Sequence, residues 1–214
     1  MPDVKETPIS FSDAMVRALR EGRKTQTRRV ILPQLPVGAD TLRDIPGSNR
    51  WYAAQVRQVN EHTTEYTPLG SDQQHPWRCP YGAPGDRLWV KEAWHQHYAG
   101  EVLGGRPCYR ADDKCQAALP WKSSRYMPRW ASRILLELTD VRIQQVQEIS
   151  EADAIAEGVL PEDWEDRVPA GPICTSHVGR IAFRNVWDSL NHKRGYGWDA
   201  DPWVWLLTFK VLDA

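Results

Sequence analysis

Several features that would direct an interpretation are scarce or absent in this chain. Its 214 residues contain four cysteines and no paired C-x-x-C spacing, which argues against a disulfide-rich scaffold or a zinc ribbon. No apolar run approaches the ~20 residues that a membrane-spanning helix requires, and no charged start followed by an apolar stretch marks a secretion signal. We therefore expect a reduced, cytoplasmic protein with free thiols.

Metal and cofactor sites also lack a signal in the sequence. Cys108, Cys115, His95 and His97 fit no standard set of zinc ligands, and neither a phosphate-binding loop nor a Rossmann glycine pattern occurs. We expect no metal and no cofactor. The net charge is −1, so there is no global basic field to hold a long nucleic acid, and any such binding must come from local patches.

The composition is otherwise ordinary for a globular protein. Hydrophobic residues make up 41% and charged residues 26% of the chain, and the length suits one domain, or one domain with sizeable insertions. Eleven tryptophans are many for this length. Because tryptophan is mainly a large apolar surface with one hydrogen-bond donor, we expect most of them in the core.

Hydrophobic periodicity predicts a mixture of strands and helices. Strands are expected over residues 8–11, 28–32, 87–94, 106–110, 134–146 and 203–211, and a hairpin from 51–56 and 63–67. The long strand changes phase around Asp140, which indicates a bulge. Helices are expected between Ser12 and Gly22 and between Ser150 and Gly158. A third helix is predicted from an apolar stripe at helical spacing, and we expect this face to pack on the sheet. The stripe consists of Phe183, Val186, Trp187 and Leu190.

The stretch from Gly22 to Arg29 is the strongest candidate for a functional site. Glycine commonly ends a helix in the left-handed conformation, so the next residues leave the helix at a fixed point, with Lys24 and Thr27 close together. A lysine that is buried or crowded by cations loses its proton more readily and can activate a hydroxyl nucleophile. The crowding cations here are Arg17, Arg20, Arg23, Arg28 and Arg29.

A structural interpretation of the same stretch is also available. Basic residues near a helix C-terminus complement the helix dipole and contribute about 0.3 to 1 kcal/mol each. A threonine that follows them can simply begin a strand. The residues alone therefore leave catalysis and structural support open.

The string Gly22-x-Lys24-x-x-Thr27-x-Arg29 resembles the G-x-K-x-x-T-x-R signature of ASCH domains, a branch of the PUA-like superfamily. Other segments resemble the longer ASCH-like proteins often carried by phages and prophages, namely 8–29, 79–94, 127–158 and 183–209. The resemblance implies an α+β fold: a bent β-barrel with two or three flanking helices and an inserted hairpin. It further implies a single domain over 1–214, with insertions at about 33–78, 99–126 and 159–179.

The resemblance also implies an activity and its residues. One ASCH-like enzyme removes the acetyl group from N4-acetylcytidine with a threonine and a lysine of the signature and a glutamate that follows the long strand. The matching catalytic residues here are Thr27, Lys24 and Glu157, with Glu151 or Asp153 as alternatives for the acid. The implied function is an amidohydrolase acting on an N4-acylated cytosine nucleoside or nucleobase.

Four further residues are predicted to bind the substrate, two within the signature stretch and two at the end of the strand over 87–94: Arg23, Arg29, Glu92 and Trp94. For the last two, the alternative is that Glu92 pairs with a surface base and Trp94 lies in the core.

Other functions of a PUA-like module remain open. Such modules bind RNA or a modified base, and a nucleic-acid patch would consist of Arg17, Arg20 and Arg28. A ribonuclease is a third reading, although no carboxylate cluster is visible. The expected partner is a modified nucleoside or nucleobase as substrate, with RNA or single-stranded nucleic acid as the alternative. We expect no association with a membrane.

Overall fold

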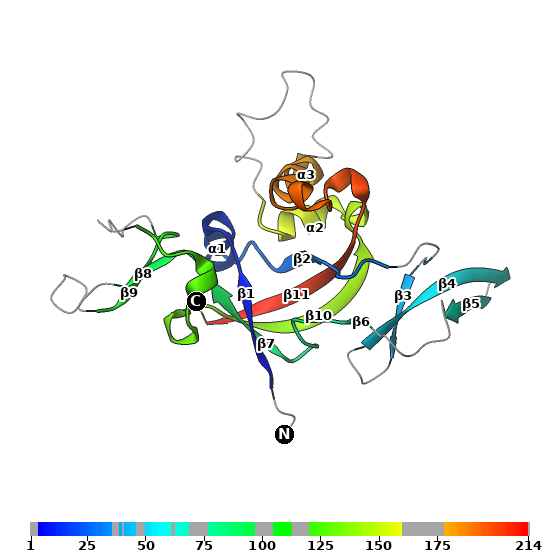
Figure 1. Ribbon diagram of the computed structural model, residues 1–214, viewed down its shortest axis with the longest axis horizontal. Helices are drawn as coiled ribbons and strands as arrows, with labels where there is room; N and C mark the ends of the chain where they lie inside the picture. The colour runs from blue at the N-terminus through cyan, green and yellow to red at the C-terminus, as the bar shows by residue number, and fades with distance from the viewer. Residues whose placement is uncertain are drawn as a thin grey trace, which may run out of the picture.

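A computed structural model describes residues 4–35, 39, 41–45, 50–60, 63–68, 77–96, 105–112, 120–159 and 178–213. Its centre is a five-stranded sheet in the order β1–β7–β10–β11–β2 (Figure 1). The strands are β1 (Glu6–Ser10), β7 (Arg87–Lys91), β10 (Leu135–Gln145), β11 (Trp203–Asp213) and β2 (Gln26–Val30). β1 and β7 are parallel, and the other neighbours are antiparallel. Together with the helices, this sheet confirms the α+β class.

The sheet bends but does not close into a barrel within the described residues. β1 and β2 are its two edges. Instead of a backbone ladder, one side chain links them: Arg29 of β2 donates to the carbonyl of Ser10, the last residue of β1, at 2.8 Å. The predicted bulge in the long strand is confirmed, because the register between β10 and β11 shifts between Leu138 and Asp140.

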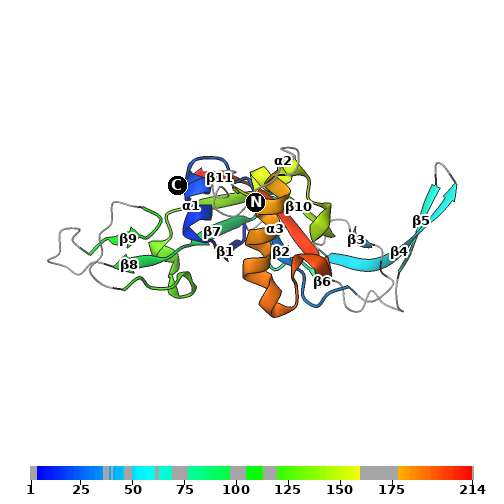
Figure 2. The same ribbon diagram turned by 90° about the horizontal axis from the view of Figure 1, so that it is seen from above.

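Two smaller sheets extend from opposite sides of the central one (Figures 1 and 2). One contains β3 (Thr41–Ile45), β4 (Arg50–Asn60), β5 (Thr63–Pro68) and the short β6 (Trp77–Arg78). The other pairs β8 (Trp94–Gln96) with β9 (Pro107–Tyr109). The predicted hairpin is confirmed as β4 and β5, and it has a further strand, β3, for which no strand was predicted. The strand expected over 87–94 breaks after Lys91.

Three α-helices flank the sheet: α1 (Asp13–Arg20), α2 (Glu151–Ala156) and α3 (Val178–Asn191). The predicted caps are confirmed, since the Ser12 hydroxyl accepts from the third residue of α1 and Ser150 forms a capping box with Asp153. Gly22 and Gly158 both adopt positive φ angles after their helices. Short 3-10 helices cover Ser124–Tyr126, Arg129–Ala131, Val146–Glu148, His192–Arg194 and Trp198–Ala200.

Strand β11, which lies between β10 and β2, is buried on both faces. Trp205, Leu207 and Phe209 join the larger apolar cluster with residues of β1, β7 and β10. Val204, which points to the opposite face because side chains alternate along a strand, packs with residues of α2 and α3. A strand with one apolar face was expected; α2 and α3 cover the second face as well.

The expectations of free thiols and of no membrane-spanning helix can be compared with the structure. Cys108 is disulfide-bonded, which contradicts the expectation of free thiols at this cysteine, whereas Cys79 is a buried free thiol. Among the described residues, every helix is too short or too polar to cross a membrane.

Candidate active site

The ends of two helices meet at Lys24. After α1, the backbone N–H groups of Arg23 and Lys24 both donate to the carbonyl of Ala18, which folds the chain tightly past Gly22. After α2, Gly158 lies so close that a Cβ added there would be 3.0 Å from the Cβ of Lys24. The N–H of Thr25 also donates to the last carbonyl of α2. The two helix ends therefore fix the position of Lys24.

Lys24 is buried, and its ammonium group is fully bonded by the protein. Only 1% of the residue is exposed. Its Nζ donates to the Glu157 carboxylate at 2.8 Å, to the Glu157 carbonyl at 2.7 Å and to the Gln26 carbonyl at 2.9 Å. The last contact places the amine beside the peptide bond that joins Gln26 to Thr27.

Burial lowers the pKa of Lys24 below its ordinary value of 10.5. The attraction and hydrogen bond of Glu157 oppose this change, and the charges of Arg29 and Arg28 add to it. The direction follows from desolvation, which penalises the charged form of an amine. Lys24 is therefore easier to deprotonate than a surface lysine, as a general base requires.

Glu157, rather than its neighbours on α2, is the acid bonded to Lys24. Its second carboxylate oxygen accepts from Arg28 at 3.1 Å. Asp153 contacts the other arm of Arg28 at 3.3 Å and accepts from Gln26 at 2.8 Å. Glu151 points elsewhere and accepts from the first N–H groups of α3. Glu157 follows the last turn of α2, where a carboxylate meets the negative end of the helix dipole. Its ion pairs with Lys24 and Arg28 offset this unfavourable interaction.

A cavity of about 500 Å³ opens beside this network. Thr27 and Glu157 both line it. Thr27 is 2% exposed, and in the part of the chain that the structure describes its hydroxyl makes no hydrogen bond. The cavity also has aromatic walls and basic groups, contributed by Tyr81, Phe183, Trp187, Trp205, Arg28, Arg29, Arg78 and Arg194.

Several of these lining residues were not anticipated from the sequence. Phe183 and Trp187 do pack in the core as expected, but their rings also face the cavity. Arg78, Tyr81 and Arg194 carry no motif, and the pattern of an isolated tyrosine or arginine gives no signal. Only their proximity in the fold identifies them.

The two arginines predicted to bind substrate differ in position. Arg29 lines the cavity and is held by the carbonyl of Ser10 and by the ring of Phe11, 5.1 Å from its guanidinium carbon. Arg23 does not line the cavity. It donates to Glu21 at 2.7 Å and to the carbonyl of Gly158 at 3.4 Å.

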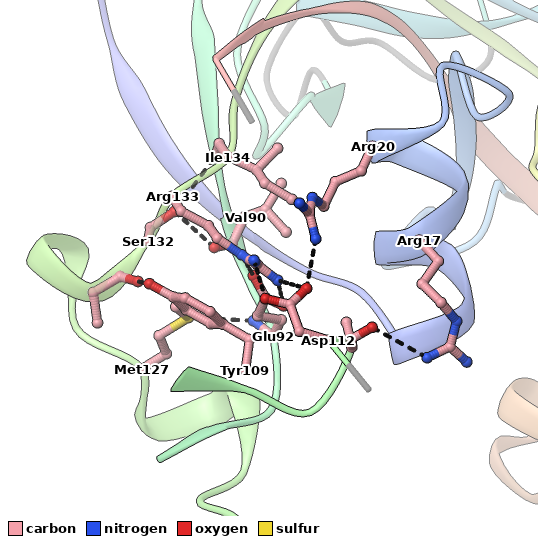
Figure 3. A network of polar contacts seen from close by, with 12 residues as sticks. Arg17, Arg20, Val90, Glu92, Tyr109, Asp112, Met127, Ser132, Arg133 and Ile134 are labelled. Carbon is pink, nitrogen blue, oxygen red and sulfur yellow. Dashed lines mark hydrogen bonds and ion pairs between the residues drawn. The ribbon is translucent and has the colours of Figure 1, made fainter. Parts of the chain in front are cut away.

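Glu92 and Trp94 are placed away from the signature. Glu92 is fully buried and forms a two-pronged ion pair with Arg133, with both N–O distances 2.9 Å (Figure 3). Burial raises the pKa of Glu92, and Arg133 opposes that change. Trp94 packs with Met127 and against the ring of Trp130. The structural alternative describes both residues, although the partner of Glu92 is an inner arginine rather than a surface base.

The three residues of the predicted nucleic-acid patch do not form a common surface. Arg20 donates to Asp112, and Arg17 donates to the carbonyl of Ala111 at 3.4 Å (Figure 3). Arg28 is buried between Glu157 and Asp153. Among the described residues, no cluster of three or more His, Cys, Asp or Glu side chains could hold a metal ion.

Comparisons with known proteins add two structural neighbours. No protein-family model matches the chain, and no curated protein matches it in sequence. Among solved structures, the chain is similar to a protein from Enterococcus faecalis V583 with the family model DUF984, at 11% identity and a TM-score of 0.42, covering 100% of this chain and 82% of that chain. It is also similar to an ASCH domain from Lactobacillus crispatus JV V101, at 13% identity and a TM-score of 0.40, covering 98% and 81%.

Proposed function

We propose that this protein is an amidohydrolase that removes the acyl group from an N4-acylated cytosine nucleoside or nucleobase. One arrangement supports the proposal: a buried lysine with a lowered pKa binds a carboxylate, and that carboxylate lines a cavity together with a threonine whose hydroxyl has no hydrogen bond among the described residues. Hydroxyl nucleophiles activated by a neighbouring base are a standard route to acyl transfer.

In the first step, the Thr27 oxygen attacks the acyl carbonyl carbon. Lys24, in its neutral form, takes the hydroxyl proton, and the Arg29 guanidinium or a backbone N–H stabilises the oxyanion. The carbon–N4 bond then breaks, and the proton passes from Lys24 to the leaving amino group of cytosine. Glu157 keeps the lysine oriented throughout.

In the second step, water hydrolyses the threonine ester. Lys24 takes a proton from the water, whose oxygen attacks the acyl carbon, and returns the proton to the Thr27 oxygen as the ester bond breaks. The products are the free carboxylic acid and the regenerated hydroxyl. No metal is needed, since the lysine supplies both proton transfers.

The cavity suits a nucleobase. Its volume of about 500 Å³ lies within the roughly 300–1,000 Å³ that is typical of small-molecule sites. Flat aromatic walls from Phe183, Trp187 and Trp205 offer stacking surfaces for a planar ring.

The test is a chromatographic assay of N4-acetylcytidine with the wild type, Thr27→Ala and Thr25→Ala. Thr25 is an exposed threonine two positions away, so its variant is a matched control. We expect cytidine release by the wild type and the control, and none above background by Thr27→Ala. Full activity in Thr27→Ala would remove the nucleophile from the proposal.

One observation favours a second function, in which the site binds a modified base without catalysis. All three protons of the Lys24 ammonium are already given to protein acceptors, as in a purely structural ion pair. In that case neither the wild type nor Thr27→Ala hydrolyses acylated cytidine, and Thr27→Ala binds the modified base more weakly than the wild type.

A further inference from the structure

The cavity at Thr27 carries more positive charge than the proposed chemistry uses. Four arginines and a single carboxylate, that of Glu157, line it. Glu157 is already neutralised by its ion pairs with Lys24 and Arg28. Three guanidinium groups remain. Arg29 is one of the two donors proposed for the oxyanion, and Arg78 and Arg194 have no role in the proposed chemistry. Within the described residues, none of these three forms an ion pair with an aspartate or glutamate.

Two of the three arginines interact electrostatically with the same residue, Tyr81. Burial raises the pKa of the Tyr81 hydroxyl, and the charges of Arg29 and Arg194 oppose that change. Tyr81 itself lines the cavity. The Tyr81 hydroxyl and the two guanidinium groups together offer several hydrogen-bond donors to a ligand group that is rich in acceptors.

Arg29 also has an unused donor. Its Nε is shielded from solvent and has no hydrogen-bond partner, while one terminal nitrogen of the same side chain is anchored on Ser10. A buried donor left unpaired is costly, so Arg29 is not fully satisfied by the described residues around it.

The cavity has a buried end and an exposed end. Thr27, Glu157 and Trp205 are buried, whereas Arg78 and Arg194 are exposed. An acylated cytosine is uncharged and offers the arginines hydrogen-bond acceptors but no ion pair. A ligand that spans both ends needs a neutral planar group at one end and an anionic group at the other.

We propose that the substrate of this site is phosphorylated: a nucleotide whose acylated cytosine lies at Thr27 and whose phosphate is held by Arg29, Arg78 and Arg194 with the hydroxyl of Tyr81. The assignment of the base rests on the proposed function, and the assignment of the phosphate rests on the charges. Arginine is well matched to phosphate because its planar fork binds two oxygens at once. The phosphate belongs either to a free mononucleotide or to a nucleic-acid strand.

The first experiment compares kcat/KM for N4-acetylcytidine and for its 5′-monophosphate. We expect the monophosphate to be favoured by about tenfold or more, since hydrogen bonds to charged groups are of that strength. In the double variant Arg78→Ala, Arg194→Ala this ratio falls towards one. The control variant Arg142→Ala removes an exposed arginine outside the cavity and leaves the ratio unchanged. Equal kcat/KM values for the two substrates in the wild type would overturn the phosphate site.

The second experiment separates this inference from the proposed function. Calorimetric titration measures binding of cytidine, cytidine 5′-monophosphate and a cytidine trinucleotide that has only diester phosphates. If no acylated substrate is hydrolysed but the monophosphate binds tighter than cytidine, and the double variant loses that advantage, the phosphate site stands and the amidohydrolase does not. Tightest binding of the trinucleotide assigns the phosphate to a strand. Equal affinities for all three ligands contradict the inference.

Discussion

Two buried networks in this protein are built from the same kinds of side chain but differ in what surrounds them. In one, Glu157 binds Lys24 and Arg28. In the other, Glu92 binds Arg133, which also binds Asp112 and lies over the ring of Tyr109 (Figure 3). Each places a nearly inaccessible carboxylate against an inner cation. Burial and ion pairing alone therefore do not distinguish a candidate active site from a structural support.

Access to a cavity separates the two networks. Glu157 lines the cavity together with Thr27, whose hydroxyl has no hydrogen bond to any described residue, whereas Glu92 and Arg133 do not line that cavity. The cation also differs, because a buried lysine can lose its proton in the accessible pH range and an arginine cannot. A titratable amine beside an open space can do chemistry, while a charged arginine in a closed cluster can only hold elements together.

The largest expected difference is in catalysis after removal of the two cations. Lys24→Met should lower kcat for N4-acetylcytidine by roughly 10²- to 10⁴-fold, the usual effect of a general base. Arg133→Met should leave kcat of the folded protein unchanged and cost about 3–5 kcal/mol of stability, because it leaves the buried carboxylate of Glu92 without its ion-pair partner. Steady-state kinetics and urea unfolding measure the two effects. Equal kcat values for both variants would show that the networks have the same role.

Neutralising the two carboxylates should separate the networks by stability. Glu157→Gln leaves both Lys24 and Arg28 without their main partner, so we expect a loss of about 3–5 kcal/mol. Glu92→Gln should cost less, since Arg133 keeps Asp112 at 2.6 Å. Urea unfolding of the two variants provides the comparison, and a greater loss in Glu92→Gln contradicts it.

A smaller effect is expected where the helix ends meet. An alanine Cβ at Gly158 would lie 2.8 Å from the Cβ of Ala18 and 3.0 Å from that of Lys24, whereas Gly22 has open space around it. Both substitutions place alanine in the left-handed region, at about 1–2 kcal/mol. Gly158→Ala should cost about 1–3 kcal/mol more through overpacking and should also lower kcat, since Lys24 is displaced. Thermal unfolding and kinetics of the pair test this, and an equal loss in both variants would count against it.

The smallest predicted effect is a pH dependence. Because the pKa of Lys24 is lowered from 10.5 in the folded protein, the unfolded chain binds more protons at this residue between the two pKa values. Stability contributed by this site therefore rises with pH through that window and is complete above 10.5. If the neutral amine is the base, kcat/KM should rise with pH and reach its midpoint below 10.5. A pH–rate profile with no rise in this range would contradict a lysine base.

Local sequence signals predicted the parts of the site that lie close together in the chain. The cap at Ser12, the glycine after the helix and the spacing of Lys24 and Thr27 are all readable within a few residues. β2, however, begins at Gln26 rather than at residue 28 as predicted. Thr27 is therefore part of a strand, paired with Leu207 of β11. The boundary depends on that pairing, which periodicity along a short segment does not reveal.

The sequence by itself determined the element types, the helix caps, the bulge near Asp140 and the signature as the place to look. The resemblance named Glu157 with Glu151 and Asp153 as alternatives, and only the tertiary structure shows that Glu157 is the one of the three that bonds to Lys24. The tertiary structure alone separated Glu92 from the site and added Arg78, Tyr81 and Arg194 to it. Caps and turns are set by contacts within a few residues, whereas a cavity is set by residues that only folding brings together.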